Sequence, residues 1–383
     1  MADANQKPKT EILRPPAEFT FADELAALRA TDQGPRPTGW KMSPRAVRTF
    51  IIGSDGQKLS FAADGKRTAI EIRRKFYGDD ALIDRCIVTL LGQRGLLLVG
   101  EPGTAKSMLS ELLAAAISGD STLTIQGTAG TTDDQIKYSW NYAVLLAEGP
   151  QPKALVPSAI YSGMKRGTVV RFEEITRCQP EIQDTLISVL SEKVLHVPEL
   201  SGEDGIVFAG QGFNLIATAN LRDRGVHEMS SALKRRFNFE TVHAIADRAM
   251  ELRLVTEQTE KLLRDAELQV ACPPDVMDLL VSTFHDLRTG RTDDGVVIEK
   301  PTTVMSTAEA VAVGYSAGLD AYYFGSGKMD GSHVARQLAG TLVKDNPDDI
   351  KKIRHYFDAV VKTRAKSNKA WQSCWEARKH IGL

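Results

Sequence analysis

Residues 95–107, which read GLLLVGEPGTAKS, decide the fold of this chain. The first five form a continuous apolar run without polar alternation. Such a run predicts a strand buried on both faces, as in a parallel sheet that helices cover. The following eight residues are rich in glycine and end in Lys106 and Ser107, and a helical pattern begins directly after them. The order of buried strand, glycine-rich turn and helix is the order of a phosphate-binding unit.

The turn matches the P-loop pattern G-x-x-x-x-G-K-[ST] with one departure, because Ala105 occupies the position of the second glycine. In this pattern, backbone N–H groups and the helix N-terminus face the phosphates, the lysine bridges the β and γ oxygens, and the hydroxyl ligates Mg²⁺. A methyl group at Ala105 is tolerable if its φ is negative. The predicted nucleotide-binding residues are Gly100, Glu101, Pro102, Gly103, Thr104, Ala105, Lys106 and Ser107. The alternative interpretation is a chance glycine-rich turn.

The helix after the turn is expected to pack on the sheet through one apolar stripe. The stripe consists of Met108, Leu109, Leu112, Leu113, Ala116 and Ile117. Because the helix begins at Lys106, this packing would hold the turn against the strand end.

The apolar runs along the chain predict a doubly wound α/β core and then a helical domain. Buried strands are expected at 168–170 and 214–218, a β-type run at 49–52, and an amphipathic helix at 81–91. Beyond residue 244 the strand patterns largely disappear. Helices are expected there at 244–266, 274–287, 307–319, 332–343 and 348–378. The predicted division is an N-terminal extension over 1–45 with a short helical pattern near 21–28, an α/β core over 46–243, and helices over 244–383.

The composition and charge of the chain argue against several classes of protein. The 383 residues carry 48 Lys and Arg against 49 Asp and Glu, so no overall field draws the chain to nucleic acid or to an anionic membrane. The four cysteines are far apart and have no metal-ligand spacing, which argues against disulfides and structural zinc. The polar N-terminus has no signal-peptide core, and no apolar run approaches membrane-spanning length. We expect a cytoplasmic protein.

A pair of acids lies shortly after the predicted strand at 168–170. A nucleotide hydrolase needs one carboxylate on the metal side and a second that polarises the attacking water. Glu173 occupies the metal position, where Asp is usual, and Glu174 occupies the water-polarising position. Arg171 is unusual inside a strand expected to be buried. The alternative interpretation is a solvated acidic turn in which Glu174 caps the helix that begins near Gln179.

Two later segments complete the pattern. Residues 213–220, FNLIATAN, read as an apolar strand that ends in Asn220, and residues 231–237, SALKRRF, place Arg235 and Arg236 before Phe237. The order of P-loop, acidic strand, strand ending in Asn and basic pair resembles AAA+ ATPases. The segments GEPGTAKS, EEITRCQPEIQDTLISVLSE and ALKRRF are similar to the corresponding sequences of the MoxR branch of this class. The resemblance covers residues 80–245 well and the helical region loosely.

The resemblance implies roles for these residues. Asn220 would be the sensor-1 residue, which orients water together with Glu174. The basic pair would carry the arginine finger, with Arg236 matching the family position better than Arg235. A guanidinium that reaches the γ-phosphate of the neighbouring subunit makes hydrolysis depend on ring assembly. The simpler alternatives are a strand-terminating Asn and a solvated basic helix end.

Three further segments bear on the resemblance. Residues 194–209 predict a hairpin before the sensor strand. Residues 130–142 lie where family members carry an insertion that can face the centre of the ring or a client, and Tyr138, Trp140 and Tyr142 alternate there. They could form one exposed strand face, but packed core is favoured. Ala308 stands where the family has a sensor-2 arginine, so either another lid arginine substitutes or the lid senses nucleotide weakly.

We therefore expect an ATPase that requires ATP and Mg²⁺ and works as a hexameric ring. The resemblance implies a chaperone-like remodeller of protein clients, with a von Willebrand A-domain protein as a candidate partner. One alternative is a nucleotide-dependent binding scaffold with little turnover, which the departures at Ala105, Glu173 and Ala308 favour. Another is a DNA-associated motor, which the near-neutral charge disfavours.

Overall fold

The computed structural model describes residues 12–63, 66–220, 225–302, 305–342 and 346–381. Residues 1–11 of the expected extension and Thr303 and Val304 before the expected lid helix lie outside the described residues. The described chain falls into two compact units. One lies within Met1–Gly100 and Lys106–Val242, and the other within Glu101–Ala105 and His243–Leu383. The predicted three-part division remains a prediction.

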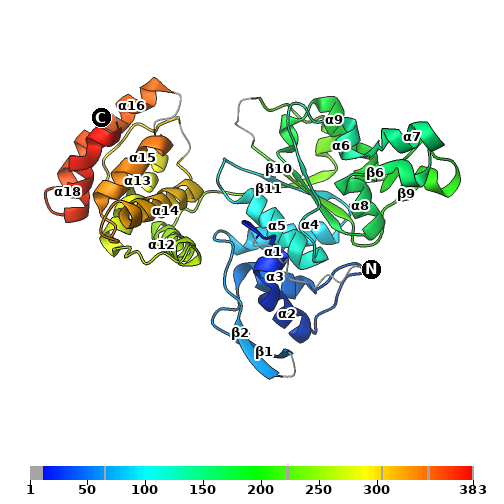
Figure 1. The fold of residues 1–383 in the computed structure, drawn as a ribbon, viewed down its shortest axis with the longest axis horizontal. Coiled ribbons are helices and arrows are strands. Elements are labelled where there is room, and N and C mark those ends of the chain that lie inside the picture. Colours follow the sequence, from blue (N-terminus) through cyan, green and yellow to red (C-terminus); the bar gives the residue numbers. More distant parts are fainter. Residues whose placement is uncertain (1–11, 64–65, 221–224, 303–304, 343–345, 382–383) are drawn as a thin grey trace. The chain divides into compact units, whose positions relative to one another are not determined.

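A five-stranded parallel sheet forms the centre of the first unit, in the order β11-β3-β10-β7-β4 (Figure 1). The strands are β3 (Gly95–Val99), β4 (Thr124–Gln126), β7 (Val169–Glu173), β10 (Asn214–Ala219) and β11 (Phe237–Thr241). The expected α/β fold is therefore confirmed. In register, Val99 pairs with Ala219, and Ala217 pairs with Phe172, so the three central strands end at one edge.

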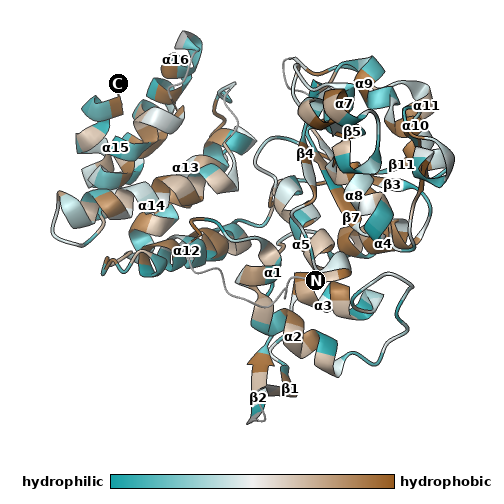
Figure 2. Ribbon diagram, turned by 45° about the vertical axis from the view of Figure 1, so that its right-hand side comes forward, coloured by the Kyte–Doolittle hydropathy of each residue, from teal (hydrophilic) through white to brown (hydrophobic). Residues whose placement is uncertain are grey.

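Side chains alternate between the two faces of the sheet, and each face has its own core. Leu96, Leu98 and Ile216 belong to one cluster with helices α3 (Pro44–Ile52), α4 (Asp80–Leu91) and α5 (Lys106–Ser118). Leu97 and Phe172 belong to a second cluster on the opposite face. Figure 2 shows hydrophobic stretches, in brown, on these strands and on the helices beside them. This two-sided burial explains the continuous apolar runs in the sequence. The helices of this unit are α1 (Ala17–Thr20), α2 (Ala22–Thr31), α3 (Pro44–Ile52), α4 (Asp80–Leu91), α5 (Lys106–Ser118), α6 (Asp133–Ile136), α7 (Tyr142–Glu148), α8 (Ala159–Arg166), α9 (Pro180–Asp184), α10 (Leu186–Ser191) and α11 (Ser231–Lys234).

The segment at 49–52 is helical, so the expected β-type run there is wrong. Ser43 caps α3 by accepting a hydrogen bond from the Ala46 amide, and Pro44 occupies the first turn. These are helix-start signals, and Val47, Phe50 and Ile51 then lie on one buried face at helical spacing. The β-branched residues favour a strand, but the cap and the helical spacing of the buried residues outweigh that preference.

Three two-stranded antiparallel sheets lie outside the central sheet in the described chain. They pair β1 (Lys58–Ala63) with β2 (Lys66–Glu71), β5 (Tyr138–Trp140) with β6 (Leu155–Pro157), and β8 (Val194–His196) with β9 (Ile206–Phe208), all antiparallel. The hairpin expected at 194–209 is therefore confirmed. The first of these sheets, together with β4 and β11, was not expected from the sequence, because these strands are short or half-exposed.

Helices build the second unit, as expected. They are α12 (Arg248–Asp265), α13 (Pro274–Thr289), α14 (Thr307–Tyr323), α15 (Gly331–Leu342), α16 (Pro347–Tyr356), a π-helical turn (Phe357–Val361), α17 (Lys362–Arg364) and α18 (Lys369–Glu376). One hydrophobic cluster joins them, with Phe284, Tyr356 and Phe357 among its buried members. The single helix expected over 348–378 is in fact interrupted, and Asn368 caps α18. Within the described part of the chain, no helix combines the length and the apolar character that crossing a membrane requires.

Candidate functional site: the carboxyl edge of the central sheet

Three polar segments leave the sheet at neighbouring points. Gly100 follows β3, Asn220 follows β10, and Glu174 follows β7, and β10 pairs with both of the other strands. Parallel strands present their carboxyl ends at the same edge, where open α/β sheets bind ligands. The fold thus brings together the start of the P-loop, the acid pair and the expected sensor residue.

The backbone of the P-loop corrects one expectation. Ala105 has a φ of 67°, in the left-handed region, and not the negative φ under which an alanine would be tolerated there without strain. Gly103 also has a positive φ, of 75°. An L-residue in this conformation brings its Cβ close to the following carbonyl oxygen, which is why the pattern has glycine at the position of Ala105.

Lys106 and Ser107 open helix α5, as the pattern predicts. The Lys106 side chain is buried, and its Nζ donates to the Gly100 carbonyl over 3.1 Å. Ser107 Oγ donates to Glu173 Oε2 over 2.7 Å. Leu109, Leu112 and the other later members of the expected apolar stripe are buried, whereas Met108 is exposed and does not belong to it. The hydroxyl and the metal-side carboxylate predicted from the sequence therefore meet directly.

Glu173 is held by four side chains. Its Oε1 accepts from Ser110 Oγ at 2.6 Å and from Arg171 Nη2 at 2.8 Å, and its Oε2 accepts from Ser107 Oγ and, at 2.8 Å, from Thr218 Oγ1. Burial alone would raise the pKa of Glu173, but the hydroxyl donors and the Arg171 charge together lower it. The carboxylate is therefore ionised and fixed in position.

Glu174 adopts a strained backbone and contacts Asn220. Its φ is 54°, and its amide donates to Thr218 Oγ1 over 2.9 Å. Glu174 Oε1 accepts from Asn220 Nδ2 at 3.4 Å, and Oε2 pairs with Arg177. Asn220 Oδ1 is buried without a hydrogen-bond partner among the described residues. A buried amide oxygen left in this way is available to a ligand or to water.

The two candidate finger residues differ in their contacts. Arg236 Nε donates to Ser191 Oγ at 2.6 Å, and its Nη1 donates to the Ala232 carbonyl at 2.5 Å. Arg235 caps α11 through its backbone amide, and its exposed side chain makes no hydrogen bond or ion pair within the part of the chain that the structure describes. Both residues follow α11 directly, and in the described residues neither guanidinium hydrogen-bonds to Glu173 or Glu174.

The sequence interpretation missed several members of the site. It noted Arg171 only as unusual, and it did not name Ser110, Thr218 or Arg177. A signal existed for Arg171, because residues two apart in a strand share a face, so Arg171 and Glu173 must point to the same side. No spacing rule links Ser110 or Thr218 to Glu173, because the fold alone brings α5 and β10 beside β7.

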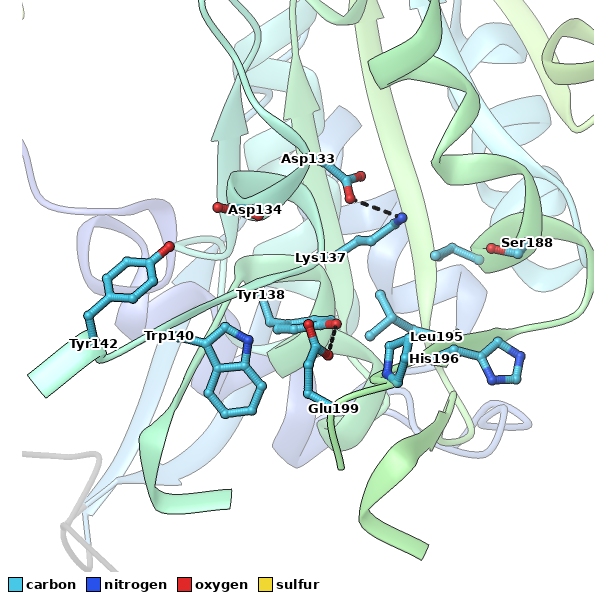
Figure 3. A pocket seen from close by; sticks show the side chains of 12 residues that line it. Asp133, Asp134, Lys137, Tyr138, Trp140, Tyr142, Ser188, Leu195, His196 and Glu199 are labelled. Carbon is cyan, nitrogen blue, oxygen red and sulfur yellow. Dashed lines mark hydrogen bonds and ion pairs between the residues drawn. The ribbon is translucent and has the colours of Figure 1, made fainter. Parts of the chain in front are cut away.

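A second polar hollow lies on the first unit, where the aromatic residues of the 130–142 segment line a cavity of about 530 Å³ (Figure 3). Tyr138 donates to Glu199 at 2.7 Å, and Trp140 stands edge to face with Tyr138. Both are half-buried and pack against the core while lining the cavity, so they are neither fully buried core nor a fully exposed strand face. Tyr142 is 64% exposed and begins α7, so neither the core interpretation nor a single strand face holds for it.

The donor set at the sheet edge fits Mg²⁺. This ion prefers oxygen ligands, keeps several waters, and is bound in nucleotide sites by one or two protein oxygens together with phosphates. Ser107 Oγ and the Glu173 carboxylate supply such oxygens, and the hydrogen bond between them leaves a lone pair of the hydroxyl available. The fit rests on these two groups.

Comparison with protein families gives two matches. Residues 95–237 match the model of the AAA domain of the dynein-related subfamily, and residues 249–382 match the model of the YehL-like AAA+ ATPase C-terminal domain. The first match contains all the residues of the site from Gly100 to Arg236. The AAA+ resemblance is therefore confirmed, whereas the MoxR resemblance stays a prediction.

Among individual proteins, the chain is similar to the uncharacterized protein YehL of Escherichia coli (strain K12). The two are 48% identical over 370 residues, which cover 97% of this chain and 98% of that protein. An uncharacterized protein of Staphylococcus aureus (strain USA300) is 28% identical over 144 residues, which cover 38% of this chain and 53% of that protein.

Among solved structures, the chain is similar to NtrX from Brucella abortus. The TM-score is 0.48 at 12% sequence identity, over 80% of this chain and 64% of the NtrX chain. A structure of the same protein in complex with ATP gives 0.47 over the same shares. This chain thus spans less than two thirds of the length of those chains.

Proposed function

Because this chain belongs to the YehL-like family of AAA+ ATPases, we propose that it binds ATP with Mg²⁺ at the carboxyl edge of its central sheet and hydrolyses it. The observation that carries the proposal is the convergence of Gly100, Glu174 and Asn220 at the ends of three adjacent parallel strands. The direct contact between Asn220 and Glu174 supports it further.

The P-loop residues bind the triphosphate. Backbone N–H groups of residues 100–107 and the N-terminus of α5 face the phosphates, and the Lys106 ammonium exchanges the Gly100 carbonyl for phosphate oxygens. Ser107 and Glu173 would hold the metal, Ser107 through its hydroxyl and Glu173 through the oxygen that already accepts from that hydroxyl. When bound, Mg²⁺ would neutralise negative charge on the β- and γ-phosphates.

Glu174 is the residue that polarises the attacking water. To do so, it must release Arg177, with which it now pairs, and turn a free carboxylate oxygen to the water. Asn220 keeps one hydrogen bond to Glu174 through Nδ2, and its Oδ1, which has no partner among the described residues, can accept from the same water. The two side chains together orient one water molecule for in-line attack.

The arginine finger comes from the end of α11 in a neighbouring subunit of a hexameric ring. Arg236 has the family position, but it must first leave Ser191 and the Ala232 carbonyl. Arg235 is exposed and requires no such release. An arginine finger raises the turnover rate roughly 10³- to 10⁵-fold in related reactions. Replacing the true finger, Arg236 or Arg235, with alanine should therefore lower turnover by a readily measured factor.

The work that hydrolysis drives is proposed from the resemblance to MoxR proteins. The chain would remodel or activate protein clients in the cytoplasm in a chaperone-like way, with a von Willebrand A-domain protein as the candidate partner. A missing sensor-2 arginine, at Ala308 near the start of α14, limits how tightly the helical unit senses nucleotide.

The test is phosphate release with ATP, with GTP and without nucleotide, together with sizing by light scattering. Glu174→Gln should keep nucleotide binding and lose about 10²- to 10⁴-fold in turnover, because the amide cannot accept the proton of water. Glu181→Gln, an exposed position on α9, is the matched control and should turn over normally. If Glu174→Gln hydrolyses ATP like the control, Glu174 is not the base.

The scaffold alternative gives a different result. It predicts that the unchanged chain binds ATP but releases phosphate no faster than Glu174→Gln. The pairing of Glu174 with Arg177 is the observation that favours this alternative, because it engages the candidate base. A DNA-associated motor predicts turnover that DNA stimulates and salt weakens.

A further inference from the structure

Arg171 is a partly buried cation beside Glu173, the carboxylate proposed to bind Mg²⁺. Its side chain is only 11% exposed, although it lies in the middle of strand β7. Burying an arginine is costly unless every donor finds an acceptor. The question is therefore what this residue does that an apolar strand residue would not do.

Four of the five N–H donors of the guanidinium have acceptors among the described residues. Nε donates to Ser110 Oγ at 3.0 Å, Nη1 donates to the Ser121 carbonyl at 3.1 Å, and Nη2 donates to the Ser107 carbonyl at 3.1 Å and to Glu173 Oε1 at 2.8 Å. Arg171 thus joins the first turn of α5 to the strand that carries Glu173. The planar fork of arginine suits this set of fixed acceptors better than an ammonium would.

The contacts divide the two oxygens of Glu173 between different tasks. Arg171 and Ser110 donate to Oε1, whereas Oε2 accepts from Thr218 and from Ser107, the hydroxyl assigned to Mg²⁺. Glutamate has one more rotatable bond than the aspartate usual at this position, so it needs more support to hold one orientation. The ion pair also compensates the buried negative charge, which three hydroxyl donors alone would leave unbalanced.

We propose that Arg171 is a positioning residue for the Mg²⁺-nucleotide site, which acts by holding Glu173 so that Oε2 orients the Ser107 hydroxyl. This inference rests on the proposed function and adds a residue that the P-loop and acid motifs do not contain. It also explains how the site operates with glutamate where aspartate is usual.

The test measures how far Mg²⁺ tightens the binding of a fluorescent ATP analogue. Affinity is measured in EDTA and in Mg²⁺ for the unchanged chain, Arg171→Met, Glu173→Gln and the double variant. Loss of a residue that orients a metal ligand typically costs about 10- to 100-fold. We expect Arg171→Met to reduce the Mg²⁺-dependent tightening by about 10-fold and to leave affinity in EDTA within about twofold.

The double variant separates positioning from a general structural role. If Arg171 acts through Glu173, Arg171→Met should have little further effect once Glu173 is Gln. If it only ties α5 to β7, the two losses should multiply. Arg166→Met is the matched control, because the Arg166 side chain, which pairs with Asp120, is 52% exposed. This variant should change nucleotide affinity neither in EDTA nor in Mg²⁺.

Folding is controlled separately. Arg171 also lines a shallow hollow of about 300 Å³ with Arg14 and Glu111, so a shorter side chain leaves space that water can enter. Thermal unfolding of each variant checks this. Should Arg171→Met fail to fold, Arg171→Lys keeps the charge without the fork and should lose an intermediate share of the tightening.

Two failures are distinguishable. An unchanged chain that binds no nucleotide, or gains nothing from Mg²⁺, would overturn the proposed function. If the unchanged chain gains affinity from Mg²⁺ and Arg171→Met gains as much, only the role of Arg171 is overturned. The same holds if the losses of Mg²⁺-dependent tightening in Arg171→Met and Glu173→Gln multiply in the double variant.

Discussion

Replacing Ala105 with glycine should stabilise the protein, contrary to the usual effect of glycine. Ala105 has a φ of 67°, and an L-residue in the left-handed region costs about 1–2 kcal/mol. Glycine removes this cost, but it also has more conformational freedom in the unfolded chain. That freedom favours unfolding and offsets about 0.4–1 kcal/mol of the gained stability. We therefore expect Ala105→Gly to raise the free energy of unfolding by about 0.5–1 kcal/mol.

The assay is urea unfolding followed by circular dichroism, with identical conditions for all variants. Ala81→Gly is the matched control, because Ala81 is exposed in the first turn of α4 and has no positive φ. Glycine in a helix costs about 0.5–1 kcal/mol relative to alanine, so the control should unfold at lower urea. The two variants should therefore shift the midpoint in opposite directions.

The outcome decides whether the P-loop is strained. If Ala105→Gly lowers the midpoint as much as Ala81→Gly, the left-handed conformation of Ala105 is wrong. A gain in stability without a change in nucleotide affinity would mean that the strain is the same in the free and bound loops. A gain in both would mean that nucleotide binding requires the loop to hold this conformation more closely.

Two further predictions concern buried groups. Glu251 is fully buried in the second unit and pairs with Arg288, whose side chain is 12% exposed. Glu251→Ala should cost about 3–5 kcal/mol, because it leaves the partly buried charge of Arg288 without its carboxylate partner. Glu257→Ala on the exposed face should cost less than about 1 kcal/mol, and urea unfolding compares the two variants. Burial raises the pKa of Cys86 and of Cys374 to about 12, whereas an unfolded thiol ionises near 9.0. The folded chain thus keeps protons that the unfolded chain loses, so stability should fall as pH rises from 9 towards 12, and alkylation at pH 8.5 should modify neither thiol before denaturant is added.

The sequence predicted the parts of the fold that depend on local pattern. Continuous apolar runs located β3, β7 and β10, and helical periodicity located the helices of the second unit. Strand β11 was missed because it is half-exposed and follows the basic pair closely. Residues 49–52 were assigned wrongly because β-branched composition outweighed the Ser43 cap, a signal that the sequence already contained.

The candidate site was predictable where a motif fixes both residue and spacing, as for Lys106, Ser107 and Glu174. It was not predictable where only the packing of distant segments creates the contact. Thr218 illustrates the limit, because its hydroxyl accepts from the Glu174 amide and donates to Glu173 across two strands that are far apart in sequence. No property of Thr218 itself distinguishes it from other strand threonines.

The strained positions of the site carry a consequence for its chemistry. Among the five non-glycine residues with positive φ in the described chain, two are Ala105 and Glu174, which belong to the P-loop and the acid pair. Such conformations cost about 1–3 kcal/mol each and persist only where the surrounding structure enforces them. For Glu174, the Thr218 hydrogen bond to its amide supplies part of that enforcement. Thr218→Val should therefore disturb both acids together, Glu173 by losing a donor and Glu174 by losing its backbone anchor. If Thr218→Val turns over more slowly while Mg²⁺ tightens nucleotide binding as much as in the unchanged chain, the hydrogen bond to the Glu174 amide matters more than the one to the Glu173 carboxylate.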